Sequence, residues 1–118
     1  MAEKNNIVDF STLNEMLYGE TQYIKEFAQA AIVSFQEFKT NYTTHLRAGD
    51  ETNFRKAGHK IKPVAQMLGI DRVIENYEEA KNNLMGEGDQ NDRENMIAEI
   101  EALCGRVVEE LQEIVENA

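Results

Sequence analysis

His59 is the residue best suited to chemistry in this chain, because it is a nucleophile surrounded by cations. It lies in residues 52–70, a stretch that contains no acidic residue and four of the 12 lysines and arginines. These four are Arg55, Lys56, Lys60 and Lys62. If the stretch is helical, its apolar side chains form one stripe that faces a core, and His59 points away from that stripe. We therefore expect an exposed imidazole in a cationic setting.

The spacing around His59 adds to this expectation, although an exposed histidine on a polar helix face is often only a solvated side chain. His59 and Lys62 form an H-x-x-K pattern, and an apolar run after them closes in Leu68 and Gly69. In these residues the chain resembles the histidine phosphotransfer (HPt) domains of phosphorelays. The segments AGD at 48–50 and FRKAGH at 54–59 are similar to the family as well.

The resemblance implies a phosphoryl carrier. His59 would be the phosphoacceptor, and Lys62, one helical turn later, would stabilise the phosphoryl charge. The partner would be a receiver (response regulator) domain that supplies the phosphorylated aspartate and its bound Mg²⁺. The chain itself would bind no cofactor and no metal.

Pro63 and Val64 depart from the family pattern, which usually has a small residue, most often glycine, four places after the histidine. Proline has no N–H to donate to the carbonyl of His59, and a proline inside a helix tends to kink it. We expect Pro63 to reshape the surface beside the imidazole without abolishing transfer.

Four further residues are candidates for a supporting role. Arg55 and Lys56 lie on the same outer surface as His59 and can offset phosphoryl charge. Gln66 either donates a hydrogen bond to a phosphoryl oxygen or only faces water, and we favour a weak functional role. Met67 either belongs to an apolar docking surface for the partner or packs at the end of its helix, and the sequence does not separate these two interpretations.

Composition restricts the classes of function. The 118 residues fit one domain, and the formal charge of −10 disfavours nucleic acid and anionic membranes as partners. The sequence has neither an apolar signal segment nor a run long enough to span a membrane, so we expect a cytoplasmic protein. It lacks the glycine-rich nucleotide-binding motifs, so we expect a phosphoryl carrier without ATP-dependent kinase activity. The single cysteine, Cys104, is expected to be a buried thiol.

Apolar periodicity predicts an all-α fold, an antiparallel four-helix bundle with a short N-terminal capping helix, in one domain spanning 1–118. The short helix ends near Leu17, and a long helix covers about 21–47. Gly49 and Asp50 connect it to the helix that carries His59, which ends at Gly69. A fourth helix starts at residue 70 or 71, and after a loop at 86–92 the last helix covers about 93–116. Because the stripes can all be buried within one bundle, we expect a monomer.

Three side chains outside the His59 helix are assigned structural roles. We interpret Lys81 as a lysine that extends from the margin of an apolar stripe toward water. We count Glu99 among the solvated acidic residues of the last helix. Gly105 is expected to mark a close approach of a neighbouring helix to that helix.

The sequence bears on two alternative functions. A carboxylate-bridged metal site in a helical bundle needs Glu-x-x-His pairs, but Tyr42 precedes His45 by three residues and Lys56 precedes His59 by three. The second alternative is a non-catalytic HPt-like adaptor that binds a receiver or kinase without being phosphorylated. Pro63 and Val64 keep this alternative open.

Overall fold

The computed structural model describes residues 6–86 and 88–117, and in this part of the chain it contains helices and connecting turns but no strand. The fold is therefore all-helical and resembles a bundle, as the apolar periodicity predicts. The helices are α1 (Phe10–Met16), α2 (Thr21–Ala48), α3 (Glu51–Met67), α4 (Asp71–Met85) and α5 (Gln90–Asn117).

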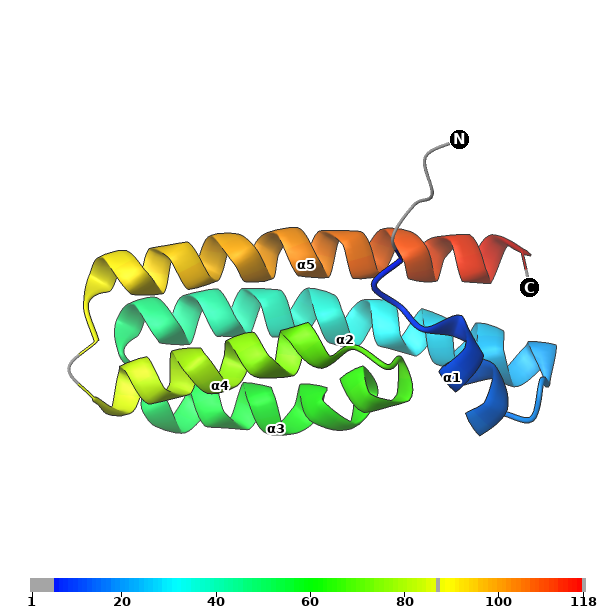
Figure 1. The fold of residues 1–118 in the computed structure, drawn as a ribbon, viewed down its shortest axis with the longest axis horizontal. Helices are drawn as coiled ribbons and strands as arrows, with labels where there is room; N and C mark the ends of the chain where they lie inside the picture. The colour runs from blue at the N-terminus through cyan, green and yellow to red at the C-terminus, as the bar shows by residue number, and fades with distance from the viewer. Residues whose placement is uncertain (1–5, 87, 118) are drawn as a thin grey trace.

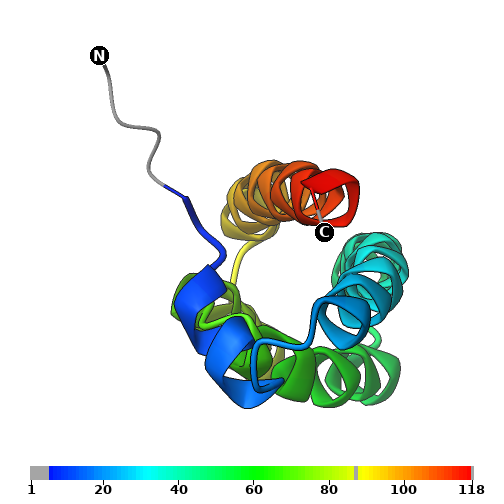
Figure 2. The same cartoon turned by 90° about the vertical axis from the view of Figure 1, so that its right-hand side faces the viewer.

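The four longer helices lie side by side, and α1 lies near one end of them (Figures 1 and 2). Helix α2 packs against both α5 and α3, while α4 packs against α3 and α5. Figure 2 shows these helices surrounding a common interior. Helix α3, which carries His59, is therefore held between α2 and α4.

The turn before α3 follows the predicted chemistry. Gly49 has a left-handed φ of 69° and ends α2, as a glycine without a Cβ readily does. Asp50 then caps α3 by accepting a hydrogen bond of 3.1 Å from the backbone N–H of Asn53. These two residues fix where α3 begins.

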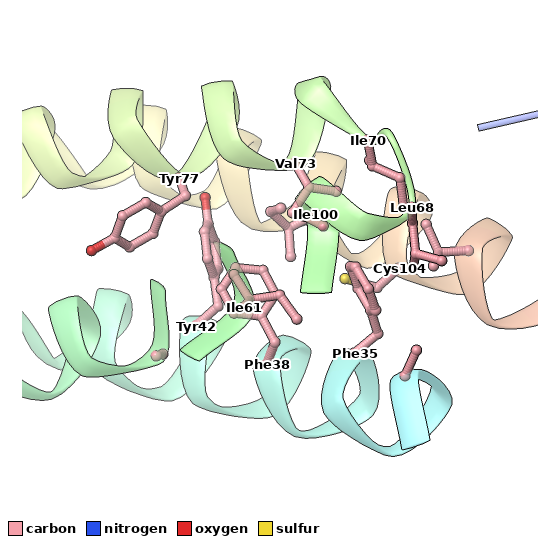
Figure 3. Close-up of a cluster of buried hydrophobic side chains, with 14 of the residues drawn as sticks. Phe35, Phe38, Tyr42, Ile61, Leu68, Ile70, Val73, Tyr77, Ile100 and Cys104 are labelled. Atoms are coloured by element: carbon pink, nitrogen blue, oxygen red, sulfur yellow. The ribbon is translucent and has the colours of Figure 1, made fainter. Parts of the chain in front are cut away.

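The interior is apolar and rich in aromatic rings, and Figure 3 shows part of it. The ring of Tyr42 lies 5.6 Å from that of Phe38 and 5.0 Å from that of Phe54, and the ring of Phe54 lies 5.1 Å from that of Tyr77. Cys104 is buried as predicted, and its burial raises the pKa of the thiol to about 12. The predicted apolar stripe of α3 also faces this core. Its buried members are Phe54, Ala57, Ile61, Ala65 and, just after the helix, Leu68.

Two expectations for the last helix are wrong. Helix α5 begins at Gln90, earlier than the predicted residue 93, because the Asp89 carboxylate accepts a hydrogen bond of 2.8 Å from the Asp92 N–H and caps the first turn. Gly105 does not mark a close helix contact, since a Cβ added there would meet nothing within 4 Å.

Across the residues that the structure describes, no helix is both long enough and apolar enough to cross a membrane.

Candidate functional site

Gly58 lets α4 approach the backbone of α3 directly beneath His59. A Cβ on residue 58 would lie only 2.0 Å from Cζ of Tyr77, so no larger residue fits unless the ring moves. The Tyr77 hydroxyl also donates a hydrogen bond of 3.4 Å to the backbone carbonyl of Arg55. Tyr77 is thus fixed against α3 and is 3% exposed, while His59, the next residue after Gly58, is exposed as predicted.

A surface hollow of about 460 Å³ opens beside His59 and is lined by residues of α3 and α4. We call it the His59 hollow. Its lining residues are Thr52, Arg55, Lys56, His59, Lys60, Lys62, Tyr77 and Lys81. Five of these side chains are lysines or arginines and none is a carboxylate, although the whole chain has a charge of −10. The fold therefore concentrates positive charge around one imidazole, and such a site favours anions.

Lys62 is oriented differently from the sequence-based expectation. Instead of being free to swing toward the imidazole, its Nζ lies 2.7 Å from Oε1 of Glu78 on α4. Lys81 Nζ lies 2.9 Å from Oε2 of the same carboxylate. The hydrogen bond from Lys62 lowers the pKa of Glu78 the most, and the hydrogen bond from Lys81 lowers it further. We call these three residues the Lys–Glu–Lys cluster.

Tyr77 forms the apolar support of this cluster. The Nζ atoms of Lys62 and Lys81 lie 5.6 Å and 6.0 Å from the centroid of its ring, which is within the range of cation–π attraction. The two ammonium groups are thus brought together by one ring and one carboxylate. Lys81 was not predicted to belong to the site.

Pro63, Gln66 and Met67 do not line the His59 hollow. Pro63 is exposed, and α3 continues through it to Met67, although the carbonyl of His59 loses the donor that residue 63 would normally provide. Gln66 is also exposed. Met67 is half-buried and packs against the core, which supports the packing interpretation of this residue.

His45, the second histidine, lies apart from the hollow at the end of α2. Its Nδ1 is 3.8 Å from the Asp50 carboxylate. The pKa of Asp50 is lowered first by its hydrogen bonds from Asn53 and to a lesser extent by His45. His45 therefore takes part in the turn between α2 and α3.

A second polar cluster, on the α5 side of α4, was not predicted from the sequence. Asn76 is fully buried; its side-chain oxygen accepts a hydrogen bond from the Tyr42 hydroxyl, and its Nδ2 donates to Glu99 at 2.6 Å. Arg72 forms a two-pronged ion pair with the same carboxylate, at 2.9 Å and 2.6 Å. We call Tyr42, Arg72, Asn76 and Glu99 the Asn76 cluster. The sequence signal that could have found it was a polar residue, Asn76, within the apolar stripe of α4.

The residues described include no group of three or more histidine, cysteine or acidic side chains close enough to hold a metal ion.

Comparison with known proteins gave no relative from which to infer function. No protein-family model matches the chain, and searches of curated proteins and of solved structures found no match.

Proposed function

We propose that this chain is a histidine-containing phosphotransfer protein, in which His59 receives a phosphoryl group from the aspartate of a receiver domain and passes it on. One observation carries the proposal: an exposed imidazole lies at a hollow lined by five cationic side chains and no carboxylate. Phosphoryl transfer requires a positioned nucleophile and neutralisation of the phosphoryl charge. The His59 hollow offers both.

The transfer reaction is a direct displacement at phosphorus. A ring nitrogen of the His59 imidazole forms the P–N bond with its lone pair. The P–O bond to the aspartate of the receiver breaks, and the electron pair leaves with the carboxylate. The ring keeps its other N–H as a phosphorylated imidazolium, and the reverse reaction regenerates the neutral histidine.

The proposal includes the surroundings of the reaction. The partner is a receiver domain of a response regulator or hybrid histidine kinase, and Mg²⁺ is bound by that domain rather than by this chain. Arg55 and Lys56, which line the hollow, attract the acidic pocket of the receiver and accelerate encounter. The protein is cytoplasmic and acts as a monomer. A stable dimer in light scattering would contradict the last point.

The finer fold that we propose is an antiparallel four-helix bundle with α1 as the capping helix. It is supported by the short connections of the chain, since α3 begins at Glu51 after α2 ends at Ala48, and α4 begins at Asp71 after α3 ends at Met67. The colours in Figure 1 can be followed back and forth along the molecule from α2 to α5. Such short connections favour reversal of direction between neighbouring helices.

A second candidate function is favoured by one observation, the contact between Lys62 and Glu78. An adaptor that binds a receiver without accepting a phosphoryl group has no use for a free lysine, and it would tolerate both this ion pair and Pro63. The adaptor uses the His59 hollow as a docking surface only. Its binding would therefore survive loss of the imidazole.

Incubation with a phosphorylated receiver domain and Mg²⁺ separates the two functions. We expect wild-type protein to acquire label that is acid-labile and alkali-stable, the behaviour of phosphohistidine. His59→Gln should acquire none. His45→Gln is the matched control, because it removes the other histidine of the chain and should be labelled like wild type.

The opposite result is equally informative. If a broad panel of receivers fails to label the wild-type protein, the carrier function is wrong. If in addition His59→Gln still binds a receiver with wild-type affinity, the adaptor function replaces it.

A further inference from the structure

Glu78 competes with any incoming anion for Lys62 and Lys81, because its carboxylate already pairs with both ammonium groups. The carboxylate of Glu78 accepts one ammonium group on each oxygen, at 2.7 Å and 2.9 Å. The cluster thus has two positive charges and one negative charge, and both of its lysines line the His59 hollow. Its resting arrangement holds the two cations on α4 instead of leaving them free for the imidazole.

Stability alone gives little reason for this arrangement. The side chains of Lys62 and Glu78 are both 37% exposed and that of Lys81 is 23% exposed, and ion pairs that water reaches contribute little to folding because water screens them. The buried contact of Tyr77 with Gly58 already holds α4 against α3. The cluster nevertheless borders the face of α3 that carries the candidate nucleophile.

We propose that Glu78 is an electrostatic latch on the phosphoryl site, and that Lys81 is a second phosphoryl-binding cation, contributed by α4. This inference rests on the proposed function of His59. In the unphosphorylated protein Glu78 holds both lysines above Tyr77. When His59 carries a phosphoryl group, the ammonium groups leave Glu78 for the phosphoryl oxygens.

The charges give the direction of this exchange. A phosphoryl group carries nearly two negative charges and three acceptor oxygens near neutral pH, whereas Glu78 carries one charge and two oxygens. Lysine has a flexible four-carbon stem and three donors, so its ammonium group can move between acceptors without a change in the backbone. Glu78 is therefore a positioning residue that lowers anion affinity in the resting state.

The first test is binding of inorganic phosphate to the full chain, followed by NMR at the side chains of His59, Lys62 and Lys81. Glu78→Gln removes the competing charge and should tighten phosphate binding about threefold, the scale of an exposed ion pair. Glu75→Gln is the matched control, since Glu75 lies on the same helix but is paired with Arg72. Lys81→Met should weaken phosphate binding by about the same factor.

The second test uses phosphoramidate, a small P–N phosphoryl donor, in place of a receiver. The nitrogen of phosphoramidate takes up a proton from water and leaves as ammonia when its P–N bond breaks. A new P–N bond forms to a ring nitrogen of His59. We expect Glu78→Gln to be labelled faster than wild type and Glu75→Gln at the wild-type rate. Lys81→Met should be labelled more slowly.

The two tests distinguish failure of the latch from failure of the proposed function. If wild type is labelled at His59 but Glu78→Gln behaves like Glu75→Gln in labelling and in phosphate binding, the latch is wrong and the carrier function stands. If Glu78→Gln binds phosphate more weakly than wild type, the latch is also wrong. If no variant is labelled by any donor, both the carrier function and the latch are overturned.

Discussion

Helix α4 presents two polar clusters to its two neighbours, and they differ in how completely their members are paired. Toward α5, Asn76 is buried and joins Tyr42 to Glu99, which is held in turn by Arg72. Toward α3, the Lys–Glu–Lys cluster is partly exposed and has one cation more than its carboxylate can neutralise. The first cluster is complete without a ligand, whereas the second has charge left for one.

Burial and charge balance thus separate structural polar residues from candidate binding residues in this molecule. A buried hydrogen-bonding group costs free energy when its partner is lost, so the Asn76 cluster should mainly affect stability. An exposed ion pair contributes little to stability, so the Lys–Glu–Lys cluster should mainly affect anion binding. Mutations in the Asn76 cluster are therefore expected to change stability, and mutations in the Lys–Glu–Lys cluster to change anion binding.

The largest expected effect is on the Asn76 cluster. Asn76→Ala removes the acceptor of the buried Tyr42 hydroxyl and one of the donors to the Glu99 carboxylate. It should therefore lower the free energy of unfolding by about 3 kcal/mol. Urea denaturation followed by circular dichroism measures this change. Glu78→Gln, in the other cluster, should change the same quantity by less than about 1 kcal/mol. Equal losses in the two variants would show that the two clusters do not differ in their contribution to stability.

The next effect concerns the support beneath the Lys–Glu–Lys cluster. Gly58→Ala places a Cβ against the Tyr77 ring and should lower the free energy of unfolding by about 2 kcal/mol through overpacking. Tyr77→Leu removes the ring atoms that clash. In a double-mutant cycle, Gly58→Ala should therefore cost less when combined with Tyr77→Leu than it does in wild type, and additive effects would show that the contact is unimportant.

A smaller effect is expected from acid. Hydrogen bonding to Arg72, and to a lesser extent to Asn76, lowers the pKa of Glu99 in the folded protein. An unfolded glutamate titrates near pH 4.3, so the ionised Glu99 stabilises the fold above that pH and the contribution is lost as the pH falls through the lowered folded pKa. Glu99→Gln should be about 1 kcal/mol less stable than wild type at pH 7.

The pH dependence of that difference is the check. Unfolding curves of wild type and Glu99→Gln should converge as the pH is lowered below about 4.3, the ordinary value for glutamate. Glu78→Gln should show the same sign, because the pKa of Glu78 is also lowered, with a smaller amplitude because its cluster holds no buried group. A larger acid sensitivity from Glu78 than from Glu99 would contradict the assignment of roles.

The smallest effect serves as a reference for Gly58→Ala. Gly105 lies within α5 with no atom near the position of an added Cβ, so Gly105→Ala should raise the free energy of unfolding by about 0.5 kcal/mol through helix propensity alone. Thermal or urea unfolding measures it. Destabilisation by Gly105→Ala would mean that a neighbour approaches α5 after all.

Sequence periodicity predicted the parts of the molecule that depend on one helix at a time. The stripe of α3 determined that His59 is exposed, and Gly49 with Asp50 determined where α3 begins, because cap and turn chemistry is local. Arg55 and Lys56 were assigned to the site because helical periodicity places them on the same outer surface as His59, and Lys62 because of the H-x-x-K pattern that carries the family resemblance. The structure brings all three to the hollow.

Contacts between helices could not be predicted in the same way. Whether Lys81 and Glu78 face Lys62, or whether Asn76 meets Tyr42 and Glu99, depends on how far each helix slides and rotates against its neighbour, and periodicity does not fix that register. Glu99 was classed with the solvated acids for this reason. The prediction for Gly105 was wrong for a related reason. A glycine within a helix was interpreted as the mark of a close helix contact, and the structure has no atom within 4 Å of a Cβ added there.

The contact between Gly58 and Tyr77 has a consequence for evolution of this fold. Because the ring occupies the space of a Cβ at position 58, the two positions must change together. A homologous chain with alanine or serine at position 58 should have a smaller side chain at position 77, and a chain that keeps an aromatic residue at position 77 should keep glycine at position 58. Covariation of these two positions among homologous sequences would thus indicate that α3 and α4 pack closely at this point.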